Sequence, residues 1–179
     1  MSAEKERRPS DSLLRTGLPA AEDLAVVRPS DERLARGALA VLECFQRIPC
    51  DPCASSCRRG AIAPFADIND LPSMLEADKC NGCALCVARC PGLAIFVIDL
   101  NHSPEEALIK LAYEFLPLPE KDQVVAALDR EGREVGRARV IRVQRPRDKA
   151  ETPVVWISVP KDLAWTVRNI RVEGNHGAQ

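Results

Sequence analysis

Residues 80–91 read Cys80-Asn81-Gly82-Cys83-Ala84-Leu85-Cys86-Val87-Ala88-Arg89-Cys90-Pro91. This is a complete C-x2-C-x2-C-x3-C-P string, the cysteine spacing that binds a 4Fe–4S cluster in bacterial proteins. The first three thiolates can bind three corners of one cluster, and the fourth, which precedes proline, is directed to a different cluster. The string therefore predicts electron-transfer chemistry and a second set of cysteines elsewhere in the chain.

A second set lies upstream, at Cys44, Cys50, Cys53 and Cys57. The spacing from Cys50 to Cys57 repeats the last three positions of the downstream motif, but five residues instead of two separate Cys44 from Cys50. The segments after the two motifs are also alike, residues 57–62 paralleling residues 90–95. We interpret the pattern as an internal duplication with a widened first loop, which uses all eight cysteines.

Other uses of the cysteines are open, namely a zinc site, a single cluster or disulfides. A zinc site with four thiolate ligands would leave four of the eight cysteines without a role. Disulfides require an oxidising compartment, and residues 1–8 lack the apolar core of a signal peptide. The pattern thus favours two 4Fe–4S clusters in a cytoplasmic protein.

Composition limits the partners. The 179 residues carry a net charge of −1, which gives no strong bulk attraction to nucleic acid or to acidic lipid. The longest apolar stretch, residues 93–98, is far too short to span a bilayer. We therefore expect neither a nucleic-acid partner nor a membrane span.

The chain divides into parts by composition and periodicity. Residues before Ala38 are polar with short apolar pieces, which is typical of an arm that docks on a surface. Around the cysteines we expect strands at 38–43, 61–65, 73–77 and 93–100, and a short helix at the end of each cysteine loop. The expected parts are an N-terminal arm (1–37), a cluster domain (38–100), a small β domain (101–173) and a C-terminal tail (174–179).

The β domain is predicted from alternating apolar residues. Residues 109–115 alternate with the period of a strand, which places Lys110 on the opposite face from Ile109 and Leu111. Two further strands, 124–128 and 135–143, flank a hairpin turn at 129–132, and a phase slip near Val140 indicates either a β-bulge or burial on both faces. Residues 104–106 could open a helical turn, residues 155–159 supply one more strand, and Asp162 could begin a last helical turn. These short strands predict a small SH3-like barrel.

Residues 38–100 resemble the bacterial dicluster ferredoxin domain. More specifically, residues 48–53, 60–62, 91–96 and 113–119 are similar to the 4Fe–4S subunit of FAD-dependent amino-acid dehydrogenases, such as the multi-subunit proline, hydroxyproline and opine enzymes. The resemblance covers roughly residues 30–172, and it identifies a type of subunit rather than a substrate. One departure is Arg58, which stands where proline normally follows the fourth cysteine.

The resemblance implies an α+β fold in which a dicluster ferredoxin domain precedes a small SH3-like barrel. In duplicated ferredoxins the fourth cysteine of each motif serves the other cluster. The expected ligands are Cys44, Cys50, Cys53 and Cys90 for cluster 1, and Cys80, Cys83, Cys86 and Cys57 for cluster 2. Positive charge on Arg58 and Arg59, beside Cys57, predicts that cluster 2 is the easier of the two to reduce.

Three functions are compatible with the sequence. The first is a non-catalytic electron-transfer subunit in a hetero-oligomer with FAD-containing dehydrogenase subunits, with a 2Fe–2S subunit as a further candidate partner. The second is a free ferredoxin shuttle, which would need neither the arm nor the β domain. The third is a zinc-stabilised β module that binds nucleic acid through Arg137, Arg139, Arg142, Arg145 and Arg147, although these lack interleaved aromatic residues.

No catalytic residue is expected in this chain. His102 and His176 are isolated in the sequence, and no partner residue for acid–base chemistry is visible beside either one. The carboxylates Asp67, Asp70 and Asp78 are predicted to be turn and solvent groups.

Overall fold

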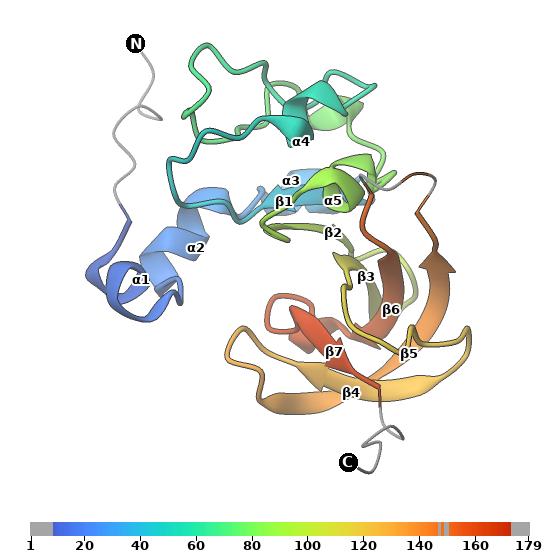
Figure 1. Ribbon diagram of the computed structural model, residues 1–179. Coiled ribbons are helices and arrows are strands. Elements are labelled where there is room, and N and C mark those ends of the chain that lie inside the picture. The colour runs from blue at the N-terminus through green and yellow to red at the C-terminus, as the bar shows by residue number, and fades with distance from the viewer. Residues whose placement is uncertain (1–8, 147, 149–150, 173–179) are drawn as a thin grey trace.

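The computed structural model describes residues 9–146, 148 and 151–172. The chain is a mixed α/β protein built on one seven-stranded antiparallel sheet with a few short helices (Figure 1). The strand order is β1-β2-β3-β6-β5-β4-β7. The strands are β1 (Leu39–Leu42), β2 (Ile95–Asp99), β3 (Glu106–Ala112), β4 (Val124–Leu128), β5 (Glu134–Gln144), β6 (Val154–Pro160) and β7 (Asn169–Arg171).

The helices are short. Three lie in the N-terminal segment: α1 (Asp11–Thr16), α2 (Ala21–Val27) and α3 (Asp31–Leu34). Two follow cysteine loops, α4 (Pro52–Ser55) and α5 (Leu85–Arg89), and two are 3-10 turns, η2 (Ala77–Lys79) and η3 (Lys161–Leu163). Among the described residues, none of these helices has both the length and the apolar character needed to cross a membrane.

The sheet is continuous across the sequence boundary expected near residue 100. Strand β2, which ends the cysteine-containing part, pairs with β3, which begins the C-terminal part. Each part nevertheless contributes most of one apolar core, although Phe96 of β2 joins the C-terminal core and Val154 of β6 joins the core around the cysteines. One core gathers residues such as Val87 and Ile95 with several cysteines, and the other gathers residues such as Ile109, Val140 and Ile157. Figure 1 shows α4 and α5 toward one end of the molecule and β4 and β7 toward the other.

Most strand predictions are confirmed, and the exceptions have local causes. The strand expected at 38–43 is β1, and the closing strand at 93–100 is β2. The strands expected at 61–65 and 73–77 reduce to one bridge between Ile62 and Met74, because Pro64 and Pro72 have no N–H to extend the ladder. The helical turn expected at 104–106 is wrong, since the Ser103 hydroxyl accepts from the Glu106 N–H and closes a turn that leads into β3.

The hairpin and the irregularity in the next strand are also present. The turn between β4 and β5 is closed by the Gly132 N–H, which donates to the Asp129 carbonyl at 3.1 Å. The register of β5 against β6 shifts between Val140 and Arg142, which is the bulge, one of the two explanations of the phase slip. The turn expected at Asp162 is the short η3.

The N-terminal arm packs on its own chain. Ser10 and Ser30 cap α1 and α3 by accepting from backbone N–H groups, and the arm then buries Leu13 and Leu34. The Arg28 guanidinium lies 4.5 Å from the ring centre of Trp165, in the C-terminal part. The arm is therefore part of the folded unit. The C-terminal tail expected at 174–179 lies outside the described residues.

Candidate functional site

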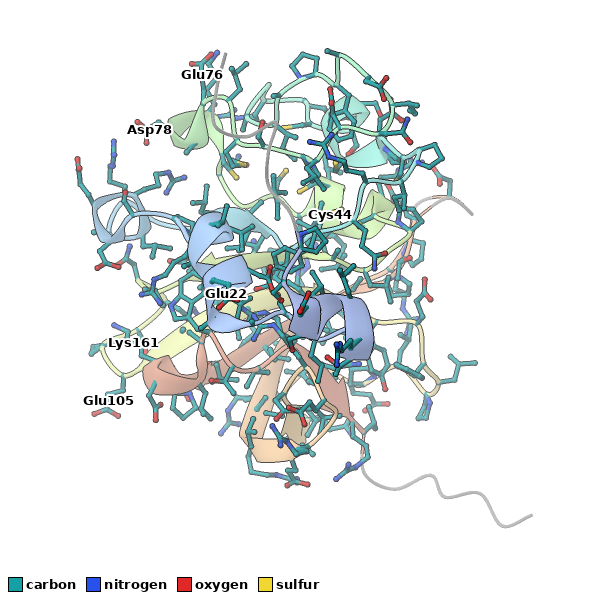
Figure 2. All side chains as sticks on the ribbon, turned by 90° about the vertical axis from the view of Figure 1, so that its left-hand side faces the viewer. Glu22, Cys44, Glu76, Asp78, Glu105 and Lys161 are labelled. Atoms are coloured by element: carbon teal, nitrogen blue, oxygen red, sulfur yellow. The ribbon has the colours of Figure 1, made fainter. Side chains whose placement is uncertain are left out.

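The fold gathers the eight cysteines into two sets of four. One cavity, here called the Cys90 cavity, is lined by four cysteines together with apolar side chains such as Phe65 and Ile95. The second, the Cys57 cavity, is lined by the other four with Ile62 and Val97. Figure 2 shows the sulfur atoms in the part of the molecule that contains Cys44. The sets are Cys44, Cys50, Cys53 and Cys90, and Cys57, Cys80, Cys83 and Cys86.

In each motif, a short helix stands before the last cysteine and separates it from the earlier cysteines of that motif. Helix α4 begins at Pro52, which suits a first helical position, and carries Cys53, while Cys57 follows its end. Helix α5 carries Cys86, and Cys90 stands just beyond its last residue. The two helices contact each other. Each therefore delivers its following cysteine to the cavity lined by the other motif.

The longer spacing between Cys44 and Cys50 does not separate Cys44 from the other cysteines of its motif. Although five residues separate it from Cys50, Cys44 lines the same cavity as Cys50 and Cys53. The Cys50 N–H donates to the Ile68 carbonyl at 3.1 Å, which attaches the widened loop to the segment that follows the first motif.

All eight cysteines lie among the described residues, and none of them forms a disulfide. Burial, and then the nearby Cys90, raise the pKa of Cys53 to about 11, and burial raises the pKa of Cys86 even further. Buried thiols of this kind stay protonated unless a cation offsets the cost of ionisation, and a bound metal would do so.

In each set, the four cysteine side chains line a cavity. Within the described residues, no three His, Cys, Asp or Glu side chains are placed to hold a single metal ion. Each set of four cysteines lines a cavity instead, and backbone N–H groups approach the sulfurs. The Ala40 N–H donates to Cys80 Sγ at 3.5 Å, and the Ala94 N–H donates to Cys90 Sγ at 3.4 Å. These features suit a multinuclear sulfur-ligated group, for which N–H to sulfur bonds adjust the potential.

The loop between Cys80 and Cys83 depends on glycine. Gly82 has φ +66°, and a Cβ there would lie 2.5 Å from the Ala38 Cβ and 3.0 Å from Val97 Cγ1. The backbone is thus pressed against β1 and β2, and this contact orients the cysteines on either side.

Gly82→Ala is therefore expected to destabilise the protein by about 2–4 kcal/mol, from the left-handed strain and the steric clash together. The matched control is Gly92→Ala, directly after the same motif, where a Cβ meets nothing within 4 Å. The control should stay within about 0.5 kcal/mol of wild type. Denaturant unfolding under anaerobic conditions measures both changes, and equal effects would contradict the close-packing explanation.

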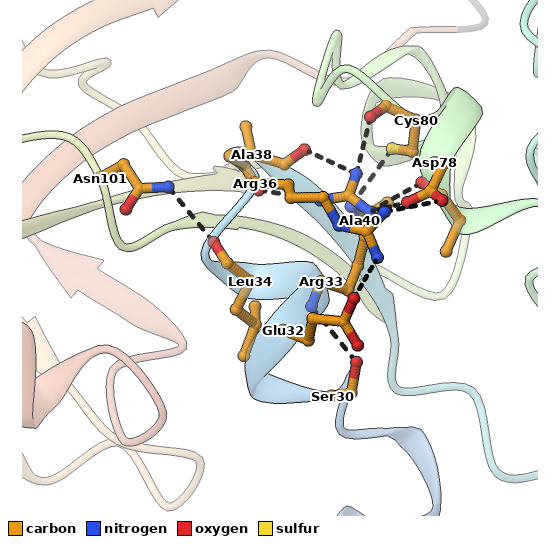
Figure 3. A network of polar contacts seen from close by, with 12 residues as sticks. Ser30, Glu32, Arg33, Leu34, Arg36, Ala38, Ala40, Asp78, Cys80 and Asn101 are labelled. Atoms are coloured by element: carbon orange, nitrogen blue, oxygen red, sulfur yellow. Dashed lines mark hydrogen bonds and ion pairs between the residues drawn. The ribbon is translucent and has the colours of Figure 1, made fainter.

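A buried arginine attaches the arm to this loop. The Arg33 guanidinium, from α3, donates to the Cys80 carbonyl at 2.8 Å and to the Ala77 carbonyl at 3.0 Å (Figure 3). It also donates to the Gly37 carbonyl at 3.1 Å and lies 3.4 Å from the Asp78 carboxylate. Because a charged donor bonded to several carbonyls is strongly held, α3 and the Cys80 loop form one rigid piece.

A second buried cation reaches the same loop from the C-terminal part. Lys110, on β3, is 6% exposed, and its ammonium donates to the Gly82 carbonyl at 2.6 Å. The ammonium also lies 3.7 Å from the ring centre of Trp156. Alternation correctly puts Lys110 on the opposite face from Ile109 and Leu111, but that face is covered by the cysteine-containing part. No signal in the sequence near Lys110 indicates this covering.

The residue before Cys44 forms the centre of a buried ion-pair network. The Glu43 carboxylate accepts from Arg168 at 2.8 Å and from Arg130 at 2.7 Å, and both arginines belong to the C-terminal part. Burial alone would raise the pKa of Glu43, but the hydrogen bonds and charges of Arg168 and Arg130 outweigh it and lower that pKa. Arg168 further lies 4.9 Å from the Phe96 ring centre. The network joins the first cysteine loop to the C-terminal strands.

The carboxylates predicted to be turn and solvent groups lie in turns or in surface ion pairs. Asp70 accepts from the Asp67 N–H in a turn, and Asp78 pairs with Arg36 at 3.0 Å. His102 is exposed in a turn, and His176 lies outside the described residues. Arg59 lines the Cys57 cavity.

The arginines of the nucleic-acid alternative lie along or just beyond β5. Arg137 pairs with Glu134 at 3.7 Å, and Arg142 lies 5.1 Å from the ring centre of Trp156. Arg139 and Arg145 are exposed, and Arg147 lies outside the described residues.

No protein-family model, curated protein or solved structure matches this chain. Function is therefore inferred from the cysteine spacing and from the side chains that line the two cavities.

Proposed function

We propose that this chain is an iron–sulfur electron-transfer subunit that carries single electrons to or from the flavin subunits of an amino-acid or amine dehydrogenase complex. The observation that carries the proposal is the sorting of eight cysteines into two sets of four, each set lining its own cavity. Each cavity receives three cysteines from one motif and one from the other, which is the arrangement of proteins with two 4Fe–4S clusters.

In this proposal Cys44, Cys50, Cys53 and Cys90 hold cluster 1. Cys57, Cys80, Cys83 and Cys86 hold cluster 2. When bound, a 4Fe–4S cluster accepts and donates one electron at a time. The chain supplies thiolate ligands, apolar walls that limit water, and backbone N–H donors to sulfur.

We further propose that the cysteine-containing part is a dicluster ferredoxin domain and that the C-terminal strands form a small SH3-like barrel. Two features support this finer assignment. Helices α4 and α5 follow the two cysteine loops in the same way, as an internal duplication requires. Strands β3 to β7 surround one apolar core that is separate from the core around the cysteines.

The proposed partners are FAD-containing subunits, with a 2Fe–2S subunit as a further candidate. The sequence contains no Gly-x-Gly-x-x-Gly loop for binding a dinucleotide, and the proposal therefore places the flavin on another chain. Several large apolar side chains are exposed, as expected of a subunit with permanent partners. They include Ile48 and Ile68 near the Cys90 cavity, Leu14 and Val26 on the arm, and Phe115 and Leu116 after β3.

Purification from the native host tests the proposal against a free ferredoxin shuttle. We expect the chain to co-elute with an FAD-containing subunit at a fixed ratio, and the complex to pass electrons from an amine substrate to an external one-electron acceptor. A chain that elutes alone with both clusters, and restores turnover in proportion to its concentration, would support the shuttle instead. A chain that contains zinc and no iron would favour the nucleic-acid alternative.

A further inference from the structure

A row of paired residues runs across five strands on the face that carries the Cys57 cavity. Ala40 pairs with Val97, Val97 with Lys110, Lys110 with Trp156, and Trp156 with Arg142. Paired residues in an antiparallel sheet project to the same face, so these side chains are neighbours. Ala40 and Val97 line the Cys57 cavity. Lys110 is therefore the next side chain in the row after the cavity wall.

The ammonium of Lys110 is held away from water without an ordinary counter-ion. It donates to the Gly82 carbonyl, between Cys80 and Cys83, and lies against the face of the Trp156 ring. Among the described residues it forms no ion pair with a carboxylate. Burial lowers the pKa of Lys110, and the negative charges of Asp99 and of the nearby cysteines oppose that shift. A buried cation is costly unless some negative group compensates it.

We propose that Lys110 is the fixed counter-charge of the group held by Cys57, Cys80, Cys83 and Cys86, and that it raises the reduction potential of that group. This inference rests on the proposed function. Ligating cysteines are thiolates, so the four ligands bring concentrated negative charge beside Lys110. Reduction adds one more electron to the same site, and a nearby cation stabilises the reduced form more than the oxidised form.

Burial makes Lys110 a stronger influence than the arginines next to Cys57. Arg58 and Arg59 are exposed, so water and salt screen their charges, although Arg59 also lines the Cys57 cavity. Lys110 is bonded to the backbone between two ligands and is shielded by Trp156, so its charge acts through protein rather than solvent. Trp156 Nε1 is buried and has no hydrogen-bond partner among the described residues, so the indole contacts Lys110 through its ring face.

The test is an EPR-monitored redox titration of purified full-length protein with both clusters present. Lys110→Gln removes the charge but keeps an N–H donor for the Gly82 carbonyl. We expect the affinity of cluster 2 for an electron to fall at least tenfold, which is about 59 mV for one electron. Cluster 1 should not move. Lys110→Met provides a second neutral variant, and Lys110→Arg should keep cluster 2 near its wild-type potential.

The matched control is Arg142→Gln, which removes an exposed positive charge from the same Trp156 ring. Its effect on cluster 2 should be much smaller than that of Lys110→Gln. The inference is overturned if the neutral variants leave the potential of cluster 2 unchanged, or if both clusters shift together. Such a result would leave the proposed function intact, because wild-type protein would still contain both clusters. Wild-type protein without two clusters would instead overturn the proposed function.

Discussion

Replacing Cys90 with serine is expected to abolish the cluster on Cys44, Cys50 and Cys53 while sparing the one on its nearer sequence neighbours. Cys90 follows Cys86 by four residues, yet the two cysteines line different cavities. Loss of a thiolate ligand removes the charge and the soft donor that the iron requires. The iron and sulfide contents should fall by roughly half, since one of two clusters of the same type is lost.

The reciprocal variant, Cys57→Ser, should remove the cluster on Cys80, Cys83 and Cys86. The two variants should therefore leave different EPR spectra, each matching one component of the wild-type spectrum. Ser56→Ala is the matched control for Cys57→Ser, because Ser56 precedes Cys57 and only donates to the Cys53 carbonyl at 3.3 Å. If Cys57→Ser instead abolished the same EPR component as Cys50→Ser, Cys57 would bind the cluster of its own motif. The predicted crossover of the fourth cysteines would then be wrong.

Glu43→Ala is expected to destabilise the protein by about 3–5 kcal/mol, the cost of leaving a buried charge without its partner. The Glu43 side chain is buried between Arg168 and Arg130, and Arg168 is buried as deeply. Removal of the carboxylate leaves the Arg168 guanidinium facing only carbonyls and the Phe96 ring. Denaturant unfolding measured under anaerobic conditions gives the change.

Glu134→Ala is the matched control, since Glu134 pairs with Arg171 at 2.7 Å on the exposed side of the sheet. Its loss should cost no more than about 1 kcal/mol, as for other exposed ion pairs. The double variant Glu43→Leu with Arg168→Leu should recover part of the stability lost in Glu43→Ala, because no unpaired charge remains on Arg168. A cost for Glu43→Ala equal to that of the control would show that the network adds no stability.

The sequence was most informative where short-range rules apply. The spacing of the cysteines, with the rule that fourth ligands cross over, predicts the two sets that line the two cavities. The bulge near Val140 was predictable as one of two alternatives, because a change of apolar phase within one strand can come from an extra residue. The hairpin at 129–132 was predictable for a similar reason, since its turn residues stand between two apolar runs.

The charged residues that reach the cysteine loops from distant parts of the sequence were not predictable in this way. Lys110 was placed on the face opposite Ile109, and that face is buried because the cysteine loop that carries Gly82 covers it. Arg33 and Glu43 looked like ordinary charged residues, but each becomes buried through partners far along the chain. Local periodicity carries no information about such partners, which only the sheet order brings together.

The N-terminal arm gives a third contrast. Its apolar pieces predicted docking, and the structure identifies the rest of this chain as one surface that it covers. Leu14 and Val26 stay exposed on the same arm. The arm can therefore be fixed to its own chain by Arg33 and still present apolar side chains to a partner.

Iron and acid-labile sulfide content, combined with the EPR spectrum of the reduced protein, tests the central claim most directly. Protein purified anaerobically should contain iron and sulfide in equal amounts, sufficient for two 4Fe–4S clusters in each chain. The fully reduced spectrum should show two components broadened by magnetic interaction, because α4, which carries Cys53 of one set, contacts α5, which carries Cys86 of the other. Protein that folds with zinc, or with a single cluster that survives loss of either Cys57 or Cys90, would contradict the account.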